Sequence, residues 1–125
     1  MRIQKQFSFD AAHYLPHAPD GHPNRRLHGH SFRVIVCLDG MPDDATGLIR
    51  DFGDVNAQLM DVREELDHRF LNEIEGLEKP TLENITLWLW TRLQAALPEL
   101  ARIEIHRDSC REACIYEGSR HGRSK

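Results

Sequence analysis

Hydrophobic and polar residues alternate with a period of two in two segments near the start of the chain, residues 7–13 and 28–38. In each segment the residues of one parity are mostly apolar: Phe7, Phe9, Ala11 and His13 in the first, and His28, His30, Phe32, Val34, Val36 and Leu38 in the second. This pattern is typical of strands with one buried face. Three histidines are therefore predicted to point to the same side as the buried phenylalanines.

Two later segments carry apolar residues at the three- and four-residue spacing of amphipathic helices. The first has Phe52, Val55, Leu59, Val62 and Leu66 on one face, and we predict that it ends just before Asp67. The second has Ile85, Trp88, Leu89 and Leu93 on its apolar face. We expect it to begin at Thr81, a favourable N-cap, with Glu83 in the first turn, and to end before Pro98.

The remaining segments complete an α+β pattern. Residues 14–27 contain three prolines and predict a long irregular loop, which in a compact domain is often functional. Short apolar runs at 102–108 and 113–117 predict a closing hairpin. Strands at both ends with two helices between them indicate a four-stranded antiparallel sheet with two helices on one face. We expect one domain over residues 1–118 and a polar tail over 119–125.

Composition and charge narrow the class of protein. A formal net charge of −4 argues against general binding to nucleic acid, which needs a basic surface. No apolar stretch has the length of a signal peptide or a membrane span, so we expect a cytoplasmic protein without membrane contact. The chain has three cysteines, Cys37, Cys110 and Cys114, and their number and spacing argue against a disulfide framework. We expect Cys37 in the core and the other two as reduced thiols.

The histidines on the apolar faces are candidate metal ligands. His28 and His30 stand two residues apart on one face of the second predicted strand, and His13 lies on the matching face of the first. Three neutral imidazoles with one open position are the donor set of many catalytic zinc sites. The alternative is that they are strand histidines with separate hydrogen-bond partners.

Two further sets of residues carry possible chemistry. Asp67 and His68 follow the first helix directly, where a carboxylate can orient an imidazole for proton transfer. The alternative is a histidine stabilised by the negative end of the helix dipole. Asp108 lies near the end of the third predicted strand, before Ser109 and Cys110, and a lone aspartate in that position is most often a turn residue that caps its own backbone.

These motifs together resemble a known family. In chain order they are FDAAH at 9–13, RLHGHS at 26–31, LDH at 66–68, PTLEN at 80–84, DSC at 108–110 and CIY at 114–116. In this combination and order they resemble the 6-pyruvoyl and 6-carboxy tetrahydropterin synthase family, over nearly the whole chain. The short length and residues 110–116 are more similar to the 6-carboxytetrahydropterin synthase of queuosine biosynthesis.

The resemblance implies a fold and a reaction. It implies the tunnelling fold (T-fold), in which subunits join their sheets into a barrel, usually as a hexamer of two trimers. It implies Zn²⁺ on His13, His28 and His30, a proton relay through Asp67 and His68, and pterin binding that involves Asp108 and Thr81. The implied reaction is a lyase reaction on 7,8-dihydroneopterin triphosphate with loss of triphosphate, and in the queuosine branch also of acetaldehyde.

The sequence departs from the family at two positions. Asn24 stands where the family has its catalytic cysteine, and an amide cannot act as a thiolate base. Asp108 stands where the family has a glutamate, so its carboxylate is one methylene shorter. The first hypothesis is thus a zinc-dependent dihydropterin lyase in which His22 or a zinc-bound hydroxide replaces the thiolate. A second is a pterin-binding paralogue without the synthase reaction. A zinc hydrolase is a third, which leaves Asp67 and His68 unexplained.

Overall fold

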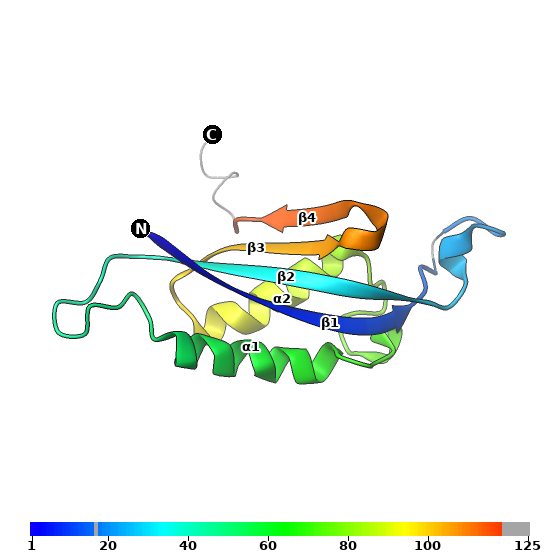
Figure 1. The fold of residues 1–125 in the computed structure, drawn as a ribbon. Coiled ribbons are helices and arrows are strands. Elements are labelled where there is room, and N and C mark those ends of the chain that lie inside the picture. Colours follow the sequence, from blue (N-terminus) through cyan, green and yellow to red (C-terminus); the bar gives the residue numbers. More distant parts are fainter. Residues whose placement is uncertain (17, 119–125) are drawn as a thin grey trace.

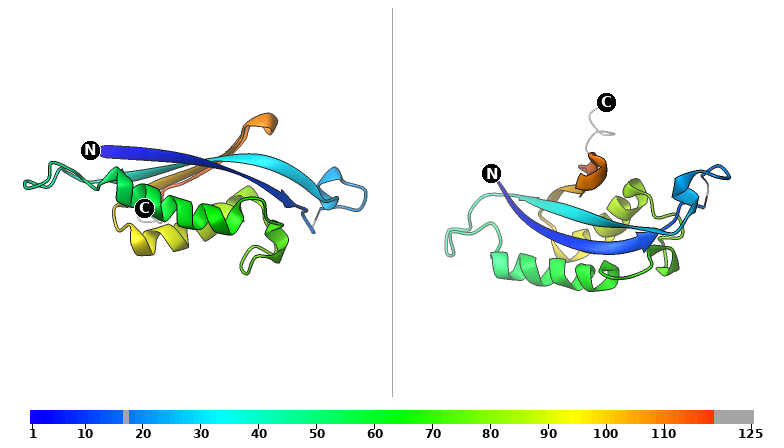
Figure 2. Two further views of the ribbon diagram at one scale, coloured as in Figure 1. Left: turned by 60° about the horizontal axis from the view of Figure 1, so that its bottom comes forward. Right: turned by 45° about the vertical axis from the view of Figure 1, so that its right-hand side comes forward.

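In the computed structural model, which describes residues 1–16 and 18–118, four strands form one antiparallel sheet (Figure 1). The strands, side by side in this order, are β1 (Arg2–His13), β2 (His28–Asp39), β3 (Leu100–Arg107) and β4 (Glu112–Tyr116). Helices α1 (Phe52–Leu66) and α2 (Leu82–Ala96) both cover the same face of the sheet (Figure 1 and Figure 2). The α+β arrangement predicted from the sequence is therefore confirmed. The predicted tail, 119–125, lies outside the described residues.

Both helices begin at residues that satisfy free backbone N–H groups of the first turn. Asp51 caps α1, and its carboxylate accepts a hydrogen bond from the N–H of Gly53. Thr81 caps α2, and its hydroxyl accepts one from the N–H of Asn84 at 3.1 Å. These caps fix where each helix starts. None of the described helices has the length and apolar character needed to cross a membrane.

The core lies between the helices and the apolar face of the sheet. Phe9 of β1 and Phe32 of β2 stack with their ring centroids 4.8 Å apart, and both are almost fully buried. Cys37 is buried as expected, and all three cysteines are free. On the other face, Arg102 and His106 both donate hydrogen bonds to Glu104. This face is therefore polar where β3 crosses it.

The connection between β1 and β2 and the segment after α1 both lie near the end of β1 that carries His13. The connection between β1 and β2 was predicted to be irregular, but residues Pro23–Arg25 form one 3-10 turn. His22 caps that turn and a proline follows at its first position, which favours helical geometry. After α1 the chain continues beside the edge of β1, parallel to it: the N–H of Ala12 donates to the carbonyl of Arg69 at 3.0 Å. The segment after α1 is thus held beside the end of β1 that carries His13.

Candidate metal centre and adjoining pocket

The three predicted ligands converge at one end of the β1–β2 pair. The strand register places His13 directly opposite His28, with His30 two residues further along the same face. One ligand atom from each ring lies within 4.8 Å of the other two, and the ring centroids are 4.6 to 5.1 Å apart. His13 is fully buried, whereas His28 and His30 are partly exposed. The predicted convergence of the three histidines is confirmed; the metal ion stays a prediction.

The hydrogen bonds of the rings fit a metal ion. His13 Nδ1 donates to the carbonyl oxygen of Pro80 at 2.8 Å, and His28 Nδ1 donates to that of Arg26 at 2.7 Å. A carbonyl oxygen only accepts, so each Nδ1 carries the proton and each Nε2 keeps a free lone pair. His13 Nε2 is buried and has no hydrogen-bond partner among the described residues. A buried polar atom without a partner is rare, and a bound cation would satisfy it.

The environment also keeps two of the rings neutral. Burial lowers the pKa of His13 from 6.5 to about 4. Burial, and after it the positive charge of Arg107, lowers the pKa of His30. Only a neutral imidazole has the lone pair that binds a metal, so both rings are in the ligand form at neutral pH.

Asp67 and His68 form a hydrogen-bonded pair at the end of α1. His68 Nδ1 donates to Asp67 Oδ2 at 2.8 Å, while Asp67 Oδ1 accepts the backbone N–H of Asp10 at 2.9 Å. The pKa of Asp67 is lowered mainly by that N–H of Asp10, and further by His68 and Arg63. The ionised carboxylate holds the proton on Nδ1, which leaves Nε2 of His68 free to accept a proton.

His68 has an unusual backbone conformation. Its φ is 58°, and its N–H donates to the carbonyl oxygen of Asp10. A left-handed conformation costs a non-glycine residue of the order of 1 kcal/mol, and such residues cluster at functional sites. The His68 side chain is 78% exposed, so packing in the core is not the reason why a residue other than glycine stands at this left-handed position.

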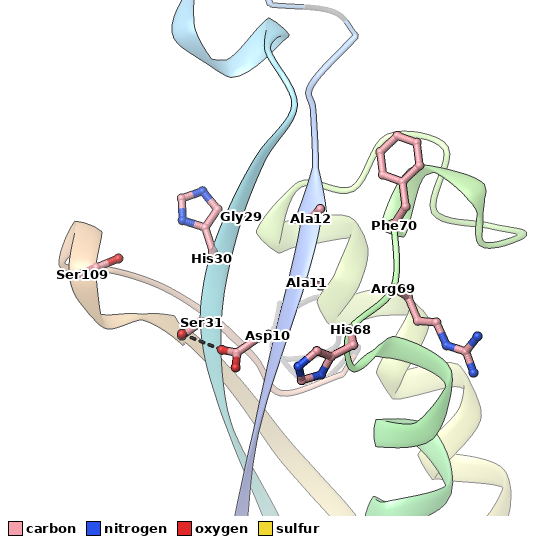
Figure 3. A pocket seen from close by; sticks show the side chains of 10 residues that line it. All are labelled: Asp10, Ala11, Ala12, Gly29, His30, Ser31, His68, Arg69, Phe70 and Ser109. Carbon is pink, nitrogen blue, oxygen red and sulfur yellow. Dashed lines mark hydrogen bonds between the residues drawn. The ribbon is translucent and has the colours of Figure 1, made fainter.

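A pocket of about 670 Å³ has both His30 and His68 in its lining. Figure 3 shows it across the ends of β1 and β2, with His30 and Ser109 on one side and the segment with His68 on the other. Its lining is Asp10, Ala11, Ala12, Gly29, His30, Ser31, His68, Arg69, Phe70 and Ser109. The hydroxyl of Ser31 donates to Asp10 Oδ1 at 2.6 Å (Figure 3). The volume suits a small organic ligand.

Asp10 and Ser31 were not predicted as site residues. They have the opposite strand parity from the histidines, which by itself indicates only exposure to solvent. They line the pocket because the segment after α1 lies beside β1 and supplies His68, Arg69 and Phe70 as the opposite wall. No local sequence signal marks that contact.

The two predicted pterin contacts already have partners in the protein. Arg33 donates to both carboxylate oxygens of Asp108, at 2.9 and 3.1 Å, and these bonds lower the pKa of that carboxyl. Asp108 therefore pairs across the sheet instead of capping its own turn through its side chain. The hydroxyl of Thr81 is engaged as the cap of α2. Pterin contact by either residue stays a prediction.

Asn24 and the possible substitute base lie apart from the pocket residues. Both belong to the 3-10 turn between β1 and β2, and neither lines the pocket that contains His30 and His68. The N–H of Asn24 donates to His22 Nδ1 at 3.1 Å. That bond leaves the ring proton of neutral His22 on Nε2, so in this conformation Nε2 is a donor.

Comparison with known proteins agrees with this fold. The family model described as 6-pyruvoyl tetrahydropterin synthase matches residues 2–119. The chain belongs to this family.

Two relatives cover almost the whole chain. It is 42% identical to the 6-carboxy-5,6,7,8-tetrahydropterin synthase of Synechocystis, over 91% of each chain. It is 34% identical to the dihydroneopterin monophosphate aldolase of Pyrococcus furiosus, over 97% of this chain and 93% of the relative. Among solved structures, the 6-pyruvoyl tetrahydropterin synthase of Caenorhabditis elegans matches with a TM-score of 0.85 and 24% identity, over 95% of this chain and 96% of that one. This last likeness shows the fold alone.

Proposed function

We propose that the protein is a zinc-dependent lyase that acts on the phosphorylated side chain of a dihydropterin, with 7,8-dihydroneopterin triphosphate as the first candidate substrate. The observation that carries the proposal is the buried, unpartnered Nε2 of His13, which lies among three histidines beside the Asp67–His68 pair. Family membership and the 42% identical 6-carboxy-5,6,7,8-tetrahydropterin synthase support the same reaction. A place in queuosine biosynthesis is part of the proposal and follows from the resemblance of the sequence motifs alone.

The residues of the site would divide the work as follows. His13, His28 and His30 would hold the zinc ion, which when bound supplies a Lewis acid for the side-chain oxygens of the substrate. Asp67 holds His68 in the tautomer with a free Nε2, so His68 would take up a proton from a carbinol group. Asp108 would bind the amino and ring N–H donors of the pterin.

Because the amide of Asn24 cannot act as a base, a further base must come from another residue. His22 is the nearest histidine along the chain, but its Nδ1 accepts the N–H of Asn24, so the ring must break this bond before Nδ1 can take up a proton. We therefore propose His68 as the principal base and His22 as a second group that acts after such a movement. An inactive pterin-binding paralogue is the alternative if neither histidine suffices.

A second candidate reaction has its own support. The dihydroneopterin monophosphate aldolase of Pyrococcus furiosus is 34% identical over 97% of this chain, which supports an aldol cleavage on a related scaffold. Such a cleavage needs a proton moved from a hydroxyl group, which a single oriented imidazole such as His68 can do. Asn24 in place of a thiol favours a reaction of this simpler kind.

Product analysis separates these candidates. Zinc-loaded protein is incubated with 7,8-dihydroneopterin triphosphate and, in parallel, with the monophosphate, and the products are identified by mass. Release of triphosphate from the first substrate supports the synthase reaction, whereas cleavage of the monophosphate alone supports the aldolase. If both compounds bind and both are recovered unchanged, the protein is a binding paralogue and the lyase proposal is wrong.

We also propose a homo-oligomer larger than a dimer, in line with the hexamer that the resemblance implies. The sheet has two edge strands, β1 and β4. The chain after α1 occupies the outer side of β1 at Asp10 and Ala12, so pairing with another subunit would use the first half of β1 and the outer edge of β4. Light scattering at micromolar concentration should give a mass well above that of two chains. A monomer mass would contradict this proposal.

A further inference from the structure

Cys110 lies beside the metal centre although it comes from the far end of the chain. It is the last residue of the 3-10 turn Asp108–Cys110, which joins β3 to β4. Its Sγ is 4.0 Å from Nδ1 of His30, and its side chain is exposed. Arg111 follows it with φ 58°, and this left-handed residue turns the chain back into β4. The hairpin therefore brings a thiol to His30, one of the three candidate ligands.

The three candidate ligands differ in what their Nδ1 atoms contact. Nδ1 of His13 and Nδ1 of His28 each face a backbone carbonyl oxygen, at 2.8 and 2.7 Å. For His30, among the described residues, the sulfur of Cys110 is the polar atom at Nδ1. The sulfur thus lies, at 4.0 Å, on the side of the ring where a carbonyl oxygen lies at the other two rings. Groups in this position orient a ligand ring and fix its tautomer.

An independent observation supports a ligand site at these rings. His13 is fully buried, and its Nε2 has no hydrogen-bond partner among the residues described. The other two rings offer ligand atoms within 4.8 Å of it. The Cys110 sulfur therefore contacts His30, one of the three candidate metal ligands.

We propose that Cys110 is a positioning residue of the metal centre: its sulfur accepts the Nδ1 proton of His30 and so keeps Nε2 of that ring free for the metal. The inference rests on the proposed metal site. It has a consequence that the two carbonyl contacts do not have, because an exposed thiol can be modified and a carbonyl oxygen cannot. Chemical modification of Cys110 should therefore weaken metal binding without touching any ligand.

The test measures zinc affinity directly. Purified full-length protein is stripped with a chelator, and zinc is titrated back in competition with a chromophoric chelator. Loss of such an outer contact typically lowers metal affinity by about 10- to 100-fold. For Cys110→Ala we expect a loss of about tenfold, at the lower end because sulfur is a weak acceptor. Cys110→Ser keeps an acceptor and should bind zinc more tightly than Cys110→Ala.

Cys114 provides the matched control. It lies on the same hairpin, where β4 pairs it with Ile105, and its side chain packs against the core. Cys114→Ala should leave zinc affinity within about twofold, if loss of an outer contact is what matters. In this variant Cys110 is the exposed thiol, because Cys37 is buried. Treatment with methyl methanethiosulfonate should then lower zinc affinity, and dithiothreitol should restore it.

Several results would overturn the inference. If Cys110→Ala binds zinc as tightly as the unchanged protein while that protein binds one zinc, the metal site stands and the role of Cys110 is wrong. If the cobalt-loaded protein shows an intense thiolate-to-metal absorption band that disappears in Cys110→Ala, the sulfur is a direct ligand and not a positioning group. If the unchanged protein binds no zinc at all, the proposed metal site itself fails.

Discussion

Arg33 donates two hydrogen bonds to Asp108, from Nε to Oδ2 at 2.9 Å and from Nη2 to Oδ1 at 3.1 Å. This pair connects β2 to the turn that follows β3, next to Ser109 at the pocket. A carboxylate has about four lone-pair positions and Arg33 uses two of them. Asp108 can therefore keep Arg33 and still accept two donors from a pterin ring.

Asp108→Asn should weaken pterin binding by roughly 2 kcal/mol or more, because one acceptor oxygen becomes a donor and the charge is lost. Asp39→Asn is the matched control. Asp39 is held by Arg2 in the same two-bond geometry, at 2.7 and 3.1 Å, but at the opposite end of β2. A fluorescence titration with pterin should show a loss in the first variant only. Equal affinities would assign Asp108 to the ion pair alone.

His68→Gly should separate stability from activity. A left-handed backbone costs a non-glycine residue about 1 to 2 kcal/mol, and glycine avoids this cost. The free energy of unfolding should therefore stay the same or rise, by up to about 1 kcal/mol after the lost bond to Asp67 is counted. Turnover should fall by about 10²-fold or more, since the proposed base is gone.

Arg111→Gly is the control for this comparison, because Arg111 has the same φ of 58°. Its stability should rise at least as much as that of His68→Gly, because no side-chain bond to Asp67 is lost, and its turnover should be unchanged. Urea unfolding and a turnover assay on both variants give the answer. An active His68→Gly protein would remove His68 from the proposed mechanism.

The sequence predicted those parts of the site that depend on local periodicity. His13, His28 and His30 were found because strand parity decides the face on which a side chain lies, and consecutive antiparallel strands usually pair. The two helices followed from spacing and from the cap residue Thr81 in the same way. Each of these predictions needs only neighbouring residues.

The parts that escaped prediction depend on how distant segments meet. Asp10 joins the site only because the chain after α1 runs beside β1. The contact between His30 and Cys110 requires the register of β2 against β3, and that register shifts by a bulge between Cys37 and Leu38. A bulge of this kind changes the pairing of the strand without a clear local signal.

Metal-free protein should lose stability as the pH falls from 6.5 to 4. Burial lowers the pKa of His13 to about 4 in the folded chain, against 6.5 when exposed. Between these values the unfolded chain binds a proton that the folded chain does not, so acid favours unfolding. The effect is absent above pH 6.5 and reaches roughly 3 kcal/mol below pH 4.

Urea unfolding of the chelator-treated protein at pH 7 and pH 5 measures this loss. His13→Leu replaces the ring by an apolar side chain, and its stability should change less between the two pH values. The NMR signals of the His13 ring provide the direct check. A ring that is already protonated at pH 6 in the folded, metal-free protein would show that burial does not have the stated effect.

Asn24→Cys should raise turnover of 7,8-dihydroneopterin triphosphate at least tenfold, if the family's catalytic geometry applies to this loop. Positioned acid–base groups contribute about 10² to 10⁴ in rate, and a thiol near a cation and histidines readily ionises. Steady-state kinetics on the two zinc-loaded proteins measure the gain. A variant that binds zinc and pterin normally but gains nothing would show that this turn does not reach the substrate.

His22→Ala is the companion experiment for the same turn. If His22 assists catalysis in the unchanged protein, His22→Ala should lower turnover. In the Asn24→Cys protein the thiolate takes over this task, so the activity there should not depend on His22. Its side-chain bond to the N–H of Asn24 lies within one exposed turn, so the rest of the fold should not respond. Unchanged turnover in His22→Ala would leave His68 as the base.

The measurement that tests the central claim most directly is turnover of 7,8-dihydroneopterin triphosphate by protein stripped of metal and then reloaded with one equivalent of zinc. We expect no product from the stripped protein, triphosphate release after reloading, and neither zinc uptake nor product in His28→Ala. Reloaded protein that holds zinc and binds the pterin but returns it unchanged would contradict the claim that this site is a dihydropterin triphosphate lyase.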